Sequence, residues 1–274
     1  MVSAEKQLSK FMKFVFWFVV ANSSSGSLIL ILFPTQTEKY FFWNITPPIN
    51  AMLVGAMYLV ASATVAYAAI RGTWESARLI LVMGFSLSVV LLVTSLMHID
   101  RFVPGAKLYY WLFVYFIFPV LAGLLYWRYE KGGTNWQVTR QAVKPITRLG
   151  ALTVGTGMLT VALVGFFFPS IIVSVWPWKL SDLMLRVFLS WLIALAAGNL
   201  WFLAEKEWTR LQPVSYMLIA LPVVVAVMMM INRPDLTGNP LGLLGFSVGL
   251  VLIGTIGVVM LRQQRGQFLP HSVQ

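Results

Sequence analysis

The chain has 274 residues, of which 59% are hydrophobic and only 11% are charged. A soluble domain has about a quarter of its residues charged, so this composition predicts a protein whose solvent is the lipid bilayer. The absence of cysteine excludes disulfides, thiolate nucleophiles and cysteine-ligated metal centres. The net charge of +11 comes from basic residues at the ends of hydrophobic runs, which favours lipid headgroups over nucleic acid as their partner.

Eight hydrophobic runs are long enough to cross the hydrocarbon core as helices, which takes about 20 residues each. The fold class predicted from them is an all-α polytopic membrane protein with two parallel-repeat four-helix units. The expected domains are a first unit over 1–130, a cytoplasmic linker over 131–146 and a second unit over 147–274. The runs lie at residues 11–33, 48–70, 77–97, 107–127, 147–168, 181–203, 214–232 and 241–262.

The first run has features of a secretory signal, because Lys6 and Lys10 precede an apolar stretch that ends at Ala21. The second unit has a hydrophobic run at the corresponding place, and cleavage after Ala21 would leave the first unit one helix short. We therefore interpret the first run as a retained membrane span.

The distribution of basic residues predicts the orientation in the membrane. An even number of spans puts both termini on one side, and basic loops resist translocation. Fourteen lysines and arginines lie on the side of the termini and six on the opposite side. We expect a multi-pass protein of a bacterial inner membrane with both termini in the cytoplasm.

Two stretches of the chain, 135 residues apart, follow the same pattern. Pro34 and Trp43 in the first recur as Pro169 and Trp178 in the second, and later matches are offset by 134 residues. Hydrophobic runs of matching length surround both stretches. A duplicated unit with an even number of spans predicts two halves related by a two-fold axis along the membrane normal.

The loop after the first span of each unit contains tryptophan followed by a hydroxyl residue. Thr46 and Ser181 stand where a helix is expected to begin, so we predict that their side chains cap the second and sixth spans. Trp43, Trp176 and Trp178 fit the aromatic belt at a membrane interface.

Small polar residues lie at similar depth in the first and fifth spans. Such residues allow close helix packing and hydrogen bonds across a contact, so we expect these spans to meet at the pseudo-two-fold axis. The alternative is a broken helix whose backbone groups bind a ligand, as in transporters. These candidate ligand-binding residues are Asn22, Ser23, Ser24, Ser27, Thr153, Thr156 and Thr160.

Two further candidate ligand-binding clusters lie at span ends. His98 and Arg101 have the spacing of a shared helix face at the end of the third span. Asp182 and Arg186 have the spacing of a salt bridge at the start of the sixth. A charged Arg186 one turn inside hydrocarbon costs about 3 kcal/mol, so we expect it to pair with Asp182, reach the headgroups or face the protein interior. Contact with headgroups is the alternative role of both clusters.

The eighth span presents Gly245 and Gly249 as a GxxxG pair, which predicts a contact face for another membrane protein. The sequence has no nucleotide-binding or zinc-protease motif, and His98 with one nearby carboxylate provides too few ligands for a metal. We therefore predict no catalytic residue and no metal site, and the sequence identifies no cofactor.

The leading functional hypothesis is a non-catalytic accessory or scaffold subunit of a larger membrane assembly. The alternative is a carrier or channel for a small neutral or apolar solute, because carriers exploit pseudo-symmetric halves. A pocket between the units would favour the carrier, whereas a filled interface with an exposed glycine groove would favour the subunit. An intramembrane enzyme comes third, because no nucleophile–base pair is visible.

The orientation can be tested by cysteine labelling, because the native chain has no cysteine. A cysteine introduced next to Gly132 should react only with membrane-permeant reagents in intact cells. A cysteine next to Pro104 should react with impermeant reagents added outside. The reverse pattern would show that the termini face outward.

Overall fold

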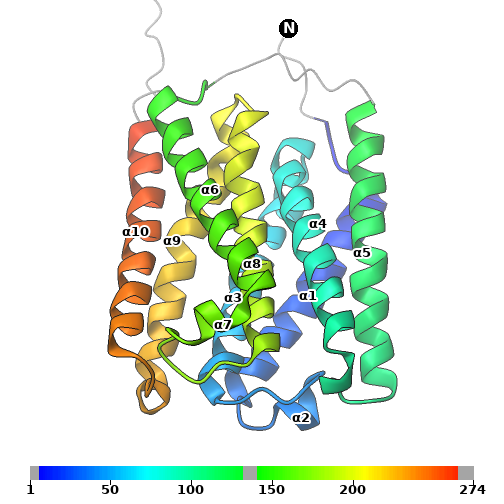
Figure 1. Ribbon diagram of the computed structural model, residues 1–274. Helices are drawn as coiled ribbons and strands as arrows, with labels where there is room; N and C mark the ends of the chain where they lie inside the picture. Colours follow the sequence, from blue (N-terminus) through cyan, green and yellow to red (C-terminus); the bar gives the residue numbers. More distant parts are fainter. Residues whose placement is uncertain (1–5, 132–140, 265–274) are drawn as a thin grey trace, which may run out of the picture.

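The computed structural model describes residues 6–131 and 141–264, which form a bundle of helices joined by short loops (Figure 1). Within these ranges, eight helices are long and apolar enough to cross a membrane, and β-structure is limited to isolated bridges. The predicted all-α fold with eight spans is therefore confirmed. The spans are α1 (Lys10–Leu32), α3 (Pro48–Arg71), α4 (Trp74–Met97), α5 (Ala106–Lys131), α6 (Pro145–Phe167), α8 (Asp182–Leu200), α9 (Trp208–Ile231) and α10 (Pro240–Gln264).

We call the side at which α1 begins and α10 ends the terminal side, at the top of Figure 1, and the opposite side the distal side. Of the expected linker, residues 132–140 lie outside the described ranges, and the described remainder between them and α6 is not helical. Short helices interrupt the loops: α2 (Thr37–Tyr40), α7 (Pro169–Val173), η1 (Ile99–Arg101), η2 (Trp201–Leu203) and η3 (Arg233–Asp235).

The two predicted hydroxyl caps have different outcomes. Ser181 caps α8 as expected, because its side chain accepts a hydrogen bond from the Met184 amide. The prediction for Thr46 is wrong: α3 begins after Pro47 without a side-chain cap from its own loop. Prolines at positions 47 and 48 have no N–H to donate. The first free N–H, that of Ile49, donates instead to Asp235 Oδ2 of the α9–α10 loop at 3.0 Å.

The spans pack in pairs within each half of the chain and cross between the halves at the centre. In the first half α1 packs on α3 and α4 on α5, and in the second half α6 packs on α8 and α9 on α10. Between the halves, α4 packs on α8 and α3 on α9. Figure 1 shows α8 in the middle of the bundle, with α5 and α10 at opposite edges. These pairings are compatible with a duplicated unit, and the duplication itself stays a prediction.

The segment before the first helix of each half pairs with the loop before the third helix. The Leu8 amide donates to the Gly72 carbonyl at 2.8 Å, and the Val143 amide donates to the Lys206 carbonyl at 2.9 Å. Each pair forms a short antiparallel bridge on the terminal side. The extended segment therefore covers polar backbone that would otherwise lie at the end of a span.

The tryptophans of the distal loops do not form an aromatic belt, so that prediction is wrong. Trp43 and Trp178 are only 1% and 2% exposed. Trp43 packs against Phe102 and Trp111, with ring centroids about 5 Å apart. Trp176 is half-buried and packs on Trp178. The loops fold inward over the helix ends because burial of these large rings is more favourable than their exposure to headgroups.

Asn50 joins the two halves on the distal side. It is fully buried, and its Oδ1 accepts a hydrogen bond from Trp178 Nε1 at 2.7 Å. Its Nδ2 donates to the carbonyls of Lys179 at 3.2 Å and Thr46 at 3.0 Å. One amide of α3 therefore satisfies polar groups from the α1–α3 loop and the α6–α8 loop.

Asn50→Ala should destabilise the protein by about 1–3 kcal/mol, because it leaves the buried Trp178 N–H and the Lys179 carbonyl without their partner. The free energy of unfolding in detergent would measure this loss. Ser25→Ala is the control, since Ser25 is exposed and bonds only to its own helix. Equal stability of the two variants would contradict a joining role for Asn50.

Candidate functional site

An apolar chamber of about 520 Å³ lies among α1, α3, α4 and α5, and residues of α8 and α9 complete its wall. Its lining runs along α1 from Phe11 near the terminal side to Ile29, and continues to Phe41 in the distal loop. None of the described residues that line it is charged. The chamber is therefore suited to an apolar occupant rather than to an ion.

The chamber is open toward the surrounding bilayer at the edges of α1 and α5. Phe14 of α1 and Phe113 of α5 line it and are 66% and 61% exposed. In the first half α5 packs mainly on α4 and α1 mainly on α3, whereas in the second half α10 also contacts α6. The first half is thus less closed between α1 and α5 than the second half is between α6 and α10.

Hydroxyl groups and an indole lie inside the chamber at mid-span. Tyr58 Oη of α3 and Tyr115 Oη of α5 are 2.7 Å apart. Trp191 of α8 packs edge-on against the Tyr58 ring, with centroids 5.2 Å apart. Sequence analysis missed these residues, because a single aromatic residue in an apolar span has the pattern of ordinary core packing.

Only part of the predicted serine and asparagine cluster of α1 reaches the chamber. Asn22 and Ser23 line it, and the side-chain oxygen of Asn22 accepts a hydrogen bond from the Tyr110 hydroxyl. Ser24 bonds to Ser62 at 2.6 Å, and Ser27 donates to the Gly55 carbonyl at 2.8 Å. These last two contacts join α1 to α3.

The expected meeting of α1 and α6 is wrong. Thr153, Thr156 and Thr160 are exposed on α6, where they line only a shallow surface depression. Small residues serve contacts inside each half instead: a Cβ on Gly155 would lie 2.9 Å from Asn199 Cβ of α8. Ser24 and Ser27 of α1 have their partners on α3, so they need no contact with the second half. A ligand role for these threonines stays a prediction.

Arg186 faces the protein interior, which was one of its three expected positions. It is 9% exposed, its Nη1 lies 2.9 Å from His98 Nε2, and its Nε donates to the Phe166 carbonyl at 3.1 Å. The predicted pair with Asp182 is wrong, because Asp182 is exposed at the first turn of α8. The structure thus joins residues from two clusters that the sequence presented separately.

Arg101 does not share a helix face with His98. The α-helix ends at Met97 and continues as a 3₁₀ turn, so the spacing rule for an α-helix no longer applies. Arg101 is 71% exposed on its side chain and pairs with Asp100 at 3.1 Å. A position at the level of the headgroups accounts for this pair.

The pKa of His98 is lowered from its ordinary value of 6.5, first by burial and then by the Arg186 guanidinium. Arg101 acts in the same direction, whereas Asp100 and Asp182 act against it. The imidazole is therefore neutral at neutral pH and accepts the hydrogen bond from Arg186.

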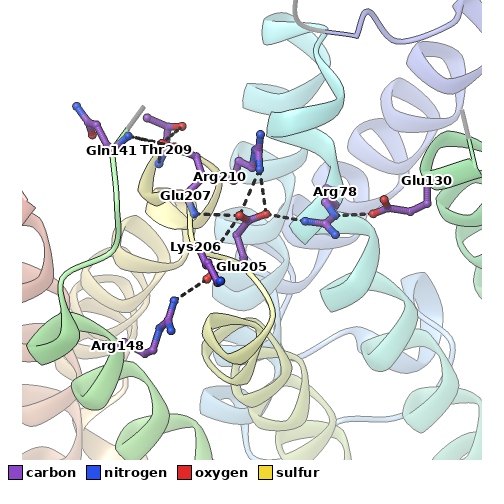
Figure 2. A network of polar contacts seen from close by, with 9 residues as sticks. All are labelled: Arg78, Glu130, Gln141, Arg148, Glu205, Lys206, Glu207, Thr209 and Arg210. Atoms are coloured by element: carbon purple, nitrogen blue, oxygen red, sulfur yellow. Dashed lines mark hydrogen bonds and ion pairs between the residues drawn. The ribbon is translucent and has the colours of Figure 1, made fainter. Parts of the chain in front are cut away.

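A network of ion pairs on the terminal side connects the two halves (Figure 2). Glu205, on the loop before α9, is 5% exposed and lies between Arg78 Nη1 of α4 at 2.6 Å and Arg210 Nη1 of α9 at 3.3 Å. Arg78 Nε also pairs with Glu130 of α5 at 2.6 Å. Arg148 of α6 donates to the Glu205 carbonyl at 3.3 Å. Sequence analysis treated these residues only as loop charges, since one-dimensional order does not show which charges meet.

The carboxylates of this network bond to donors of the protein itself, which indicates a structural role. Glu205 Oε1 also accepts the amides of Lys206 and Glu207, and Glu207 accepts the Gln141 amide and the Thr209 hydroxyl. Both carboxylates are therefore occupied by protein donors. Among the described residues, no group of three or more His, Asp or Glu residues could hold a metal ion.

The GxxxG pair of α10 lies on an open surface. A Cβ added to Gly245 or Gly249 would meet no atom within 4 Å, and α10 is the least buried of the eight spans. A different glycine, Gly257, makes the close contact with Ile219 and Leu218 of α9. Contact of the Gly245/Gly249 face with another membrane protein stays a prediction.

Eight apolar helices, with buried charged groups that have polar partners at both ends, define a multi-pass integral membrane protein. Comparisons with protein families, with curated proteins and with solved structures gave no match. The function must therefore be argued from the chamber and the surfaces of this chain.

The His98–Arg186 contact makes stability depend on pH. Because the folded pKa is below the unfolded value of 6.5, the stabilisation is complete above about pH 6.5 and decreases as the pH falls below it. The denaturation midpoint of the wild type should therefore decrease between pH 7.5 and pH 5.5. The same decrease in His98→Asn, which has no imidazole to protonate, would assign the effect to other groups.

Proposed function

We propose that the chain is a membrane-embedded binding protein and carrier for a small apolar solute that enters its chamber from the bilayer. The observation that carries the proposal is an uncharged chamber, lined by six helices, whose exposed rim residues Phe14 and Phe113 belong to helices at its open edge. An apolar solute gains little by leaving lipid for an apolar wall, so shape and a few polar contacts would provide its selectivity.

The two halves differ in how far their second span is buried, and this difference supports a binding role for the chamber of the first half. α8 is largely buried, whereas α3, which holds the corresponding place in the first half, is buried over only half of its span. The chamber lies beside this less covered helix. The second half also has a space, an open groove of about 770 Å³ between α9 and α10, but Arg233 and Arg262 line it, so it lacks the uncharged wall of the chamber.

The accessory or scaffold subunit, the leading hypothesis from the sequence, is supported by the filled interface and the exposed glycine pair that were expected for it. One continuous core fills the contact between the halves, and it includes Leu53 of α3 and Leu185 of α8. The Gly245/Gly249 face of α10 lies uncovered, as a docking face for another helix would. This role makes no use of the chamber, so a change that fills the chamber would not affect it.

The basic residues support an orientation with both termini in the cytoplasm of a bacterial inner membrane. The matching pairs α1–α3 and α6–α8 support a parallel duplication of four-helix units. Both are proposals that accompany the carrier function.

Filling the chamber should abolish solute binding. Ala61 of α3 lines the chamber, so Ala61→Phe should reduce labelling by a photoreactive alkyl diazirine at the buried lining residues Ser88 and Tyr115 by about tenfold. Labelled peptides from protein in lipid nanodiscs would be quantified by mass spectrometry. Ala63→Phe is the matched control, because Ala63 is exposed on the same helix and does not line the chamber. Equal labelling of both variants would refute chamber binding and leave the scaffold role.

A further inference from the structure

We infer that the solute carries a hydrogen-bond acceptor oxygen at mid-membrane depth, as in a lipid-soluble ketone or quinone with an apolar chain. This inference rests on the proposed binding function and names the class of solute. Four side chains with donor groups, from four helices, line the chamber, and the protons of the two tyrosines and the serine exceed the acceptors that the described chain offers them. Those groups are the side chains of Tyr58, Ser88, Tyr115 and Trp191.

The four donors lie at one depth. Each is nine or ten residues from the distal end of its own helix, α3, α4, α5 or α8. With a rise of about 1.5 Å per residue, each lies about 14 Å below that end, near the middle of a hydrocarbon core about 30 Å thick. Donors from four separate segments therefore converge on one level of the chamber.

The tyrosine pair leaves one proton unused. Tyr58 and Tyr115 bond to each other, and this is the hydrogen bond that the structure gives either hydroxyl. Two hydroxyls have two protons, and only one of them lies between the two oxygens. The second O–H has no acceptor among the described residues, and no water is available in hydrocarbon to take it. An acceptor oxygen on the solute would complete the pair.

Trp191 and Ser88 line the chamber at the same depth as the tyrosine pair. Trp191 is 7% exposed and lines the chamber with its ring, whereas its Nε1 is covered by protein atoms and does not face the open space. The Ser88 side chain, 4% exposed, also lines the chamber, and no hydrogen bond of its hydroxyl occurs in the described ranges. The Ser88 hydroxyl can donate as well as accept, so an acceptor oxygen on the solute would use its proton.

The remaining lining restricts the rest of the solute. Asn22, Ser23 and Thr64 use their polar atoms within the protein: Asn22 with Phe18 and Tyr110, Ser23 with Val19, and Thr64 with Val60. The chamber's lining on α1 extends over residues 11–29, which is about 27 Å of helix. The occupant that fits is elongated and apolar, is neutral, and has its acceptor near the middle of the chamber.

The inference can be tested with a decyl-substituted benzoquinone and decylbenzene as probes. Each would compete with the photoreactive alkyl diazirine for the wild-type protein in nanodiscs. The quinone should compete about tenfold better than the hydrocarbon, because one hydrogen bond made in hydrocarbon contributes about that factor. Tyr67→Phe, an exposed tyrosine of α3 outside the chamber, should keep the same preference.

The variants of the tyrosine pair should give a specific pattern. Tyr58→Phe or Tyr115→Phe alone removes one hydroxyl and frees the proton of the other, so each single variant should keep most of the preference for the quinone. Tyr58→Phe combined with Tyr115→Phe should lose most of it while decylbenzene competes as in the wild type. Unchanged competition by decylbenzene also shows that the double variant retains a folded chamber.

The outcomes separate this inference from the proposed function. If both probes compete equally with the wild type, the chamber binds apolar solutes but the acceptor requirement is refuted. If the double variant keeps the full preference, the tyrosine pair is not the donor and the inference fails. If neither probe competes, solute binding in the chamber fails and this inference fails with it.

Discussion

The structure depends on polar partners for the charged groups that are buried at the ends of its core, because hydrocarbon offers no other partner for a buried charge. On the terminal side Glu205 lies between Arg78 of the first half and Arg210 of the second. On the distal side Arg186 meets His98 across the same boundary. Polar contacts therefore join the halves at both ends, and apolar packing of α3, α4, α8 and α9 fills the space between them.

With the halves held in this way, their outer helices are free to differ. α10 contacts both α9 and α6, whereas α5 packs mainly on α4. Under the proposed duplication, the positions of Tyr115 and Ser88 correspond to Gly249 and Pro222, which have no side-chain donor. Tyr58, Ser88 and Tyr115 thus lie in the first half, and Trp191 of α8 comes from the second half. The presence of these donors beside the chamber is the main reason to assign binding to the first half. Binding there does not require symmetric alternating access.

The candidate site was only partly predictable from the sequence. Asn22 and Ser23 stood out because polar residues are rare at mid-span, and both line the chamber. Thr153 stood out for the same reason and lies on the surface, because composition does not show which way a helix faces. Tyr58 and Trp191 were missed, since one aromatic residue in an apolar helix is typical of core packing. Their equal distance from the helix ends was visible in the sequence, but it has meaning only once the helices are known to be neighbours.

The sequence by itself determined what depends on local chemistry. Run length and hydropathy fixed the eight spans, and the side chain of Ser181 fixed the start of α8. Only the tertiary structure decided which helices touch, why Arg186 bonds to His98 rather than Asp182, and where the chamber lies. The physical reason is that helices in lipid are apolar on every side, so their periodicity does not mark an inner face. Contacts between them are chosen by small-residue packing and by the need to pair buried polar groups, and both depend on residues distant in the chain.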